Sequence, residues 1–331
     1  MRIRISLGFL MLLLTLASRV MIAQDSATNQ PLTARCVIGL TDIKQNANGH
    51  LSIQDAELHF DTGKHHAAVP ITSIENIFTG SEVTDAGGFV GEAARDAASA
   101  APYDSGAALT LLLREKVDVL TVTYRDLNGG LHAAIFALPR NHAQQFSAEL
   151  VKQGARSGAR SKAATNATSP SQNSGNDSAI DPVSNLSANA SKPAILVEPV
   201  VALDAKIPAE FRLAIYESLV DRIRLSGLYS QVYRSGDRSA ANNPNVQTLL
   251  TEVEQFKTGS QTARELLVVV GETRVALYVK LIRPDGDPIV SQTVVGKVRF
   301  FGENLGVTRD AARRIVKILH KNLRTPPKSV S

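Results

Sequence analysis

The sequence contains a single cysteine, Cys36, among 331 residues. One thiol excludes a disulfide within the chain, whereas small extracellular domains of animals usually rely on several. We therefore expect hydrophobic cores to hold the fold, which fits a bacterial envelope protein better. Arg35 stands directly before the cysteine and the N-terminal apolar run lies far from it, so lipid modification is not expected. We interpret Cys36 as a small buried side chain at the start of a strand.

Long hydrophobic runs are also missing, since no segment approaches the roughly 20 apolar residues that cross a bilayer. The first apolar run, Ile5 to Ala17, has 13 residues; Arg2 and Arg4 precede it, and small and polar residues follow it up to Ala23. This order is typical of a secretory signal peptide, which we assign to residues 1–23. We expect an exported protein that is periplasmic or associated with the outer membrane, or secreted, with no transmembrane segment in the mature chain.

The sequence has little excess charge of either sign. It has 36 Lys and Arg against 31 Asp and Glu, a formal net charge of +5. Removal of residues 1–23 takes away Arg2, Arg4 and Arg19, so 33 basic residues face 31 acidic ones and the net charge falls to +2. So small a charge creates no broad positive field that would collect phosphates. Nucleic acid is therefore not an expected partner.

Residues 157–193 have almost nothing from which to build a core. They consist mainly of Ser, Ala, Asn, Gly and Pro, and residues 165–193 contain no aromatic side chain. Such a composition buries too little apolar surface to offset the entropy lost on ordering. We predict a disordered linker of 37 residues, with a root-mean-square span of roughly 30 to 35 Å. The linker separates two parts that we expect to pack independently.

The part before the linker is predicted to consist of short strands followed by one helix. Runs such as AELHF and DVLTVTYRD are separated by Asn, Gly and Asp, and Asn128 followed by Gly129 is a strong hairpin signal. The closing helix ends near Gly154. Its predicted apolar face carries Ala143, Phe146, Leu150 and Val151.

About seven strands and then one helix resemble a pleckstrin-homology-like or GRAM-like barrel over residues 36–154. The pattern GHLSIQDAELHF leading to VPITSIENI carries the resemblance. It implies a barrel with a C-terminal helix, interrupted here by a Gly/Ala-rich insertion at residues 79–106. It does not imply phosphoinositide binding, because the loops near the first strands offer only Lys44 and Lys64.

The part after the linker, residues 194–324, is predicted to be a small two-layer α/β domain with a mostly antiparallel sheet and two helices, so the chain is of the α+β class. One helix spans PAEFRLAIYESLVDRIRLSG and stops at Gly227. Its apolar stripe carries Phe211, Ile215, Leu219 and Ile223. The other begins near Thr308. Its apolar side carries Ala312, Ile315, Val316, Leu319 and Leu323.

The second part also resembles a bacterial envelope family of unknown function. GLYSQVY, LLTEVEQFKTGSQTAR, VKLIRPDGDPIVSQTVVGK and DAARRIVKILHKNL carry this resemblance. It implies the α/β layer found in the N-terminal Tol-propeller domain and in the curli-secretion lipoprotein. Those relatives assemble with other envelope components, and no catalytic residue is associated with the family. This chain differs in having no lipid-modified cysteine.

Two surfaces are candidate contact sites. The Gly/Ala-rich insertion precedes a predicted helix over residues 92–101 with small side chains that permit close packing on a partner. Its candidate partner-contact residues are Gly87, Gly88, Phe89, Ala93, Ala97 and Tyr103. The last helix has a basic side that can approach anionic lipid headgroups. Its candidate membrane-contact residues are Arg309, Arg313, Lys317 and Lys321.

Motifs for catalysis, cofactors or metals are not found in the sequence. The insertion lacks the glycine spacings of nucleotide-binding loops, and no G-x-S-x-G elbow is present. Of His59, His65 and His66, the adjacent pair point to opposite sides, so at most one joins His59. We therefore predict a non-enzymatic, two-domain binding or adaptor module for envelope proteins, without cofactor. The alternatives are a small-ligand-binding or hydrolytic enzyme with its site at residues 79–106, and a peripheral binder of anionic membranes.

Overall fold

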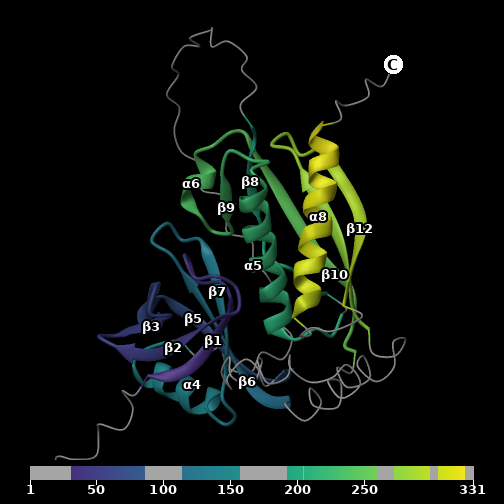
Figure 1. Cartoon of the computed structure of the whole chain (residues 1–331). Helices are drawn as coiled ribbons and strands as arrows, with labels where there is room; N and C mark the ends of the chain where they lie inside the picture. Colours follow the sequence, from purple (N-terminus) through teal and green to yellow (C-terminus); the bar gives the residue numbers. More distant parts are fainter. Residues whose placement is uncertain are drawn as a thin grey trace, which may run out of the picture.

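The computed structural model describes residues 31–85, 114–156, 192–203, 205–259, 272–298 and 305–324. These residues form two β-sheets with helices packed against them (Figure 1), which confirms the predicted α+β class. We call residues 31–156 the N-terminal half and residues 192–324 the C-terminal half. No helix among the described residues has the length and hydrophobicity that crossing a membrane requires.

The N-terminal half is one antiparallel sheet followed by a helix. Its elements are β1 (Leu32–Ile38), β2 (Ala47–Gln54), β3 (Glu57–Asp61), β4 (His66–Pro70), the short 3₁₀-helix η2 (Ile71–Ser73), β5 (Ile74–Asp85), β6 (Arg114–Arg125), β7 (Leu131–Leu138) and α4 (Ala143–Lys152). The strand order is β4-β3-β2-β1-β7-β6-β5. The predicted hairpin is present, because β6 and β7 pair on either side of the turn that contains Asn128 and Gly129.

Helix α4 closes one end of the core that lies inside the N-terminal sheet. Ala143 and Leu150 are buried there and Phe146 packs against it, as predicted. Val151 does not belong to that face, because its side chain is 40% exposed. A helix turns about 100° per residue, so the residue after Leu150 points away from the core. Gly154 follows the helix with a φ of 106°, which suits its predicted place at the cap.

The C-terminal half is a five-stranded sheet covered by two long helices. Its elements are β8 (Ala194–Val197), α5 (Ala209–Ser226), β9 (Val232–Arg234), the short helix α6 (Arg238–Ala241), β10 (Val246–Lys257), β11 (Thr273–Ile282), β12 (Pro288–Val298) and α8 (Gly306–Arg324). The strand order is β12-β11-β10-β8-β9. Strands β10, β11 and β12 pair antiparallel, whereas β8 joins β10 and β9 in parallel, so the sheet is mixed.

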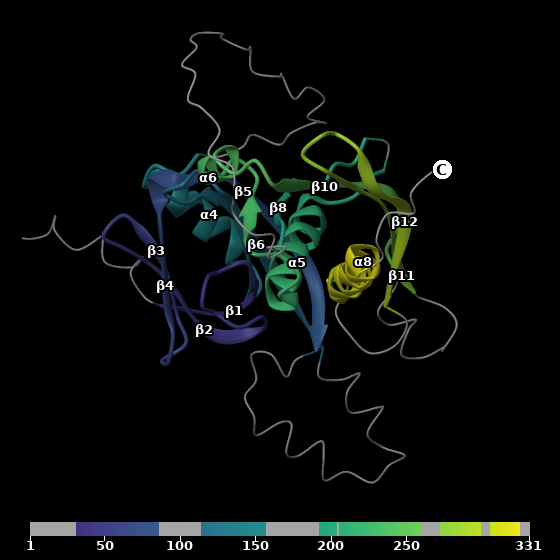
Figure 2. The same cartoon turned by 90° about the horizontal axis from the view of Figure 1, so that it is seen from above.

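Helices α5 and α8 lie side by side on one face of this sheet (Figure 2). The apolar stripe of α5 is buried as predicted, and α5 ends at Gly227, whose φ of 60° is left-handed. In α8, the side chains of Ala312, Ile315 and Leu319 are buried, and Val316 and Leu323 pack against the same core. Both helices predicted in this half are therefore confirmed.

The two halves share a hydrophobic core, and the prediction that they pack independently is wrong. Helix α5 lies between the C-terminal sheet and the outer face of the N-terminal sheet (Figure 1). The N-terminal half contributes to this core Val37, Ile38, Val117, Val119, Ile135 and Ala137. Residues 214–220 of α5 are all buried, which covers every direction around the helix. A helix buried all round packs on both sides, so α5 is a shared wall.

The predicted insertion at residues 79–106 begins later than the sequence indicated. Residues 79–85 continue β5, and they pair with β6 as far as Asp85 opposite Arg114. Apart from Val83 these residues are polar or small, and β6 supplies their backbone hydrogen bonds from a distant part of the chain, so the local pattern did not reveal a strand. The rest of the insertion and most of the predicted linker lie outside the described residues.

Candidate functional site

A buried ion pair lies where α5 meets the N-terminal sheet. Glu217 on α5 is 2% exposed, and it accepts hydrogen bonds from both terminal nitrogens of Arg234, at 2.7 and 2.8 Å. The Oε1 atom of Glu217 also accepts the backbone N–H of Ala133 on β7, at 2.8 Å. Burial opposes the charge of Arg234, but the carboxylate of Glu217 outweighs it, so the pKa of Arg234 lies above its usual range. The pair is therefore charged and fully engaged.

The turn between β6 and β7 docks directly on the turn after β9. The N–H of Leu131 donates to the carbonyl of Ser235 at 2.9 Å, and the N–H of Arg238 donates to the carbonyl of Asn128 at 3.0 Å. Gly129 and Gly236 meet here backbone to backbone. A Cβ atom at Gly129 would lie 2.8 Å from the carbonyl oxygen of Gly236. The two glycines thus permit the close approach of the halves.

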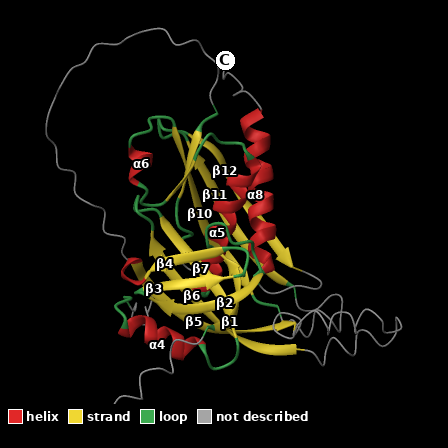
Figure 3. Ribbon diagram, turned by 60° about the vertical axis from the view of Figure 1, so that its left-hand side comes forward, coloured by secondary structure: helices red, strands yellow, loops and turns green. Residues whose placement is uncertain are grey.

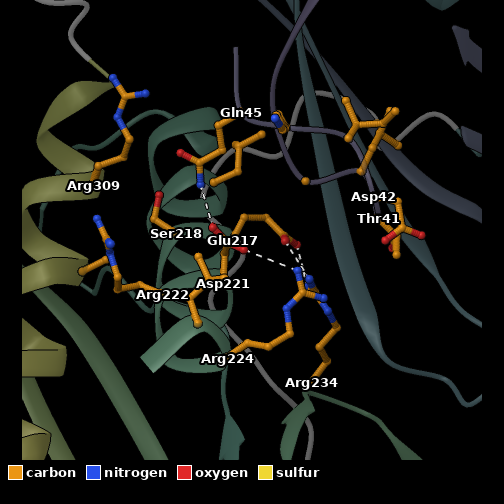
Figure 4. A pocket seen from close by; sticks show the side chains of 17 residues that line it. Thr41, Asp42, Gln45, Glu217, Ser218, Asp221, Arg222, Arg224, Arg234 and Arg309 are labelled. Carbon is orange, nitrogen blue, oxygen red and sulfur yellow. Dashed lines mark hydrogen bonds and ion pairs between the residues drawn. The ribbon is translucent and has the colours of Figure 1, made fainter. Parts of the chain in front are cut away.

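A cavity of about 480 Å³ opens beside this junction. Loop residues 39–45 bound it from the N-terminal half, and α5 and α8 bound it from the C-terminal half (Figure 4). We call it the junction pocket. Its polar lining consists of Thr41, Asp42, Lys44, Gln45, Glu217, Ser218, Asp221, Arg222, Arg224, Arg234 and Arg309. Gln45 donates to Asp221 across the pocket at 2.9 Å, so both halves build it.

A second hollow runs along the outer side of β12. Strand β12 is an edge of the C-terminal sheet and lies beside α8 (Figure 3). We call this hollow the edge groove. It is lined by Thr293, Val294, Val295, Lys297, Arg313, Arg314, Lys317 and Ile318. Arg313 and Arg314 both contact Asp310, at 2.5 and 2.7 Å, and Lys297 contacts Glu272 at 3.4 Å. The four basic side chains of the lining thus outnumber the two carboxylates that they contact, so the groove has a surplus of positive charge.

The structure separates the predicted membrane-contact residues. Arg309 is half-buried and lines the junction pocket, whereas Arg313 and Lys317 are exposed and line the edge groove. Lys321 is exposed further along α8. Membrane contact through the last three stays a prediction.

The predicted partner-contact residues all lie outside the described residues. These are Gly87, Gly88, Phe89, Ala93, Ala97 and Tyr103. Neither partner contact nor an enzyme site in the insertion is therefore tested by the geometry.

The structure buries Cys36 and brings two of the three histidines together. Cys36 is buried in β1, as predicted, and burial raises the pKa of its thiol to about 12. His66, and not His65, meets His59, with 3.1 Å between ring nitrogens. In the described part of the chain, no three His, Cys, Asp or Glu side chains gather as metal ligands would.

The sequence analysis singled out neither Glu217 nor Arg222 and Arg224, the two exposed arginines of the junction pocket. Glu217 is two residues from Ile215, which places it about 200° around the helix from the apolar stripe. That position normally faces water, and only the packing of the N-terminal half buries it. No local signal for the junction pocket exists, because its walls come from loop 39–45, α5 and α8.

No family model matches this chain, and no curated relative matches it. Among solved structures, the PelC dodecamer from Paraburkholderia phytofirmans is similar at 15% identity with a TM-score of 0.30, over 40% of this chain and 92% of that chain. A point variant of the same dodecamer in another crystal form has 15% identity and a TM-score of 0.31, over 44% of this chain and 96% of that chain. Likeness at this level supports no argument about function.

Proposed function

We propose that this chain is an exported bacterial envelope protein that binds other envelope proteins and carries out no catalysis. The signal-like residues 1–23 support export. The single observation that carries the binding function is the edge groove. Partners in such contacts often add a strand to an exposed sheet edge, where backbone hydrogen bonds supply affinity.

Strand β12 has the features of an edge that accepts a partner. It is 11 residues long, whereas β9, at the opposite edge of the sheet, has three. Proteins usually protect long edges with proline, charge or a covering element. In β12, proline stands only at the first position and the one charged residue, Lys297, contacts Glu272, while Ser291, Gln292 and Thr293 are exposed. The basic side chains of α8 beside it favour an acidic extended segment.

The proposal includes a pleckstrin-like barrel for the N-terminal half and an envelope-type α/β domain for the C-terminal half. The N-terminal half has seven antiparallel strands followed by α4, which is the element order of a pleckstrin-like barrel. Under the second resemblance, residues 194–324 form an envelope-type α/β domain. Because the halves share a core, they would present their surfaces in fixed relative positions. This arrangement differs from the two independently packed parts on a flexible linker that the sequence suggested.

Site-specific photocrosslinking in intact bacteria tests the proposal. A photoreactive amino acid at Gln292 lies on the exposed edge, and one at Lys152 on α4 is an equally exposed control on the N-terminal half. We expect position 292 to capture one discrete envelope protein and position 152 not to capture it. The substitution Lys317→Glu reverses an exposed charge in the groove and should reduce that capture several-fold. Equal capture at both positions, or capture unaffected by Lys317→Glu, would contradict the proposal.

A further inference from the structure

We propose that the junction pocket binds a small organic oxyanion, a carboxylate or a phosphate monoester that carries a short apolar group. This site is separate from the edge groove, and it does not depend on the proposed function. A cavity of about 480 Å³ lies within the range of roughly 300 to 1,000 Å³ that small-molecule sites occupy.

The floor of the pocket is closed to cations. Glu217 is its deepest carboxylate, and both of its oxygens already accept hydrogen bonds from Arg234 and from the N–H of Ala133. Asp221 is also engaged, because it accepts from Gln45 at 2.9 Å and contacts Arg224 at 3.4 Å. Two of the three carboxylates in the lining are therefore already paired, and the third, Asp42, lies on the opposite side of the pocket from Arg222 and Arg309.

Basic groups without partners make the rest of the pocket attractive to an anion. The lining contains five basic residues, Lys44, Arg222, Arg224, Arg234 and Arg309, against three acidic ones, Asp42, Glu217 and Asp221, a difference of +2. Within the described part of the chain, Lys44, Arg222 and Arg309 contact no carboxylate. These three cations are free to bind a ligand.

Two of these cations line the same side of the pocket from neighbouring helices. Figure 4 shows Arg222 on α5 and Arg309 on α8 on one side of the pocket, with Asp42 on the other. A guanidinium group offers a planar fork of N–H donors that matches a carboxylate or phosphate. Arg222 and Arg309 each offer such a fork to an oxyanion in the pocket.

The apolar lining sets the class of ligand. Ile38, Leu40, Ile43, Leu225 and Ala312 complete the walls, and Leu225 is 69% exposed at the rim. An apolar group on the ligand would cover this side chain and remove it from water. We therefore expect an alkyl-bearing oxyanion to bind more tightly than the bare inorganic ion.

Calorimetric titration of the full mature chain at low salt provides the test. The probes are hexyl phosphate, inorganic phosphate and hexanol, which separate the contribution of charge from that of the alkyl group. We expect hexyl phosphate to bind at least tenfold more tightly than inorganic phosphate, and hexanol not to bind. The double variant Arg222→Gln, Arg309→Gln should weaken hexyl phosphate at least tenfold. Arg222 is exposed, and neither arginine makes a hydrogen bond to another residue in the described ranges, so this variant should fold, as circular dichroism would verify.

The control variant Arg274→Gln removes one arginine charge from an exposed position on β11 that does not line the pocket. It should leave the affinity unchanged. An equal loss in this control, unchanged binding in the double variant, or no preference for hexyl phosphate over inorganic phosphate would each overturn the proposal.

Flotation with vesicles that contain phosphatidylglycerol separates the two sources of the oxyanion. Flotation that the double variant loses would identify a lipid headgroup, and hexyl phosphate binding without flotation would identify a free metabolite. Flotation that depends on Lys317 and Lys321, without hexyl phosphate binding, would overturn the pocket and favour membrane contact by α8.

Discussion

Glu217 makes three hydrogen bonds: the one from the backbone N–H of Ala133 on β7 joins the two halves, and the two from Arg234 hold the ion pair within the C-terminal half. Arg234 in turn donates to the carbonyl of Leu131 at 3.0 Å, so the pair satisfies backbone groups at the end of a hairpin. Removal of one charge leaves the other buried and unpaired. The resulting loss in the free energy of unfolding is larger than the stability that the intact pair contributes. The side chains therefore act as a unit.

We expect Glu217→Gln to lower the free energy of unfolding by about 3 to 5 kcal/mol, because it leaves the charge of Arg234 uncompensated in the junction. The double variant Glu217→Gln, Arg234→Gln should lose much less than the sum of the two single changes. Urea unfolding followed by circular dichroism measures all three. Arg283→Gln, which breaks an exposed pair with Asp287 at 3.6 Å, should cost about 1 kcal/mol or less. Additive losses in the buried pair would contradict the coupling.

His132 on β7 makes stability depend on pH. Burial and the nearby charge of Arg234 lower the pKa of His132 below its usual 6.5, and its Nδ1 atom has no hydrogen-bond partner among the residues that the structure describes. Below about pH 6.5 the unfolded chain takes up a proton that the folded chain resists. The unfolding free energy should therefore fall as the pH drops from 7 towards 5.

The substitution His132→Gln should flatten this fall, whereas the same change at the exposed His50 should not. Thermal melts across pH 5 to 7 measure the slope. Asp126 accepts from His132 at 3.0 Å, and its own pKa is lowered chiefly by that hydrogen bond against the effect of burial. The stability that Asp126 contributes is lost only at a pH below the range in which His132 acts, so the pH of the loss distinguishes the two groups. An identical slope in the His132 variant would contradict this assignment.

Elements whose signals are local were predictable from the sequence. Helix α5 was fixed by a stripe every three or four residues and by Gly227 at its end, and the hairpin of β6 and β7 by Asn128 and Gly129. The exposure of Val151 also follows from local geometry, because it comes one residue after the buried Leu150. The end of β5 and the burial of Glu217 were not predictable. Each depends on a neighbour that lies far away in sequence, and hydrophobic periodicity carries no information about such neighbours.

The contact of two turns through glycine backbones gives a prediction at this scale. Gly129 has a φ of 89° and Gly286 one of 93°, so alanine strains the backbone equally at both positions. Only at Gly129 would the added Cβ also meet another backbone, 2.8 Å from the oxygen of Gly236; at Gly286 nothing lies within 4 Å.

Gly129→Ala should therefore destabilise the chain more than Gly286→Ala, by about 1 to 3 kcal/mol, which is the usual cost of overpacking. Chemical denaturation of the two variants gives this difference directly. If both variants unfold at the same urea concentration, the turns do not meet as closely as the structure shows.

The molecule as a whole is one body rather than two. Helix α5 packs on the C-terminal sheet and on the N-terminal sheet, and backbone hydrogen bonds join residues 128–131 to residues 235–238. The linker predicted for residues 157–193 connects halves that are already in contact. Covalent continuity between them is therefore not needed to keep them together.

Cleavage within the predicted linker tests this conclusion. With a protease site inserted near Asn173, we expect the two fragments to elute together in size-exclusion chromatography after complete cutting. The Gly129→Ala variant, cut in the same way, should release them at a lower urea concentration. Fragments that separate in buffer would show that the shared core is too weak to hold the halves.

The shared wall also imposes an order on folding. The backbone N–H of Ala133 can donate its hydrogen bond only once Glu217, 84 positions later in the chain, has been synthesised. Val119 and Ile135 are likewise buried only when α5 packs on them. Until α5 has been synthesised, the apolar outer face of the first sheet stays exposed to solvent. Intermediates that expose such a surface tend to aggregate. The nascent protein is thus most vulnerable just before its second half arrives, and a holding chaperone would matter most at that moment.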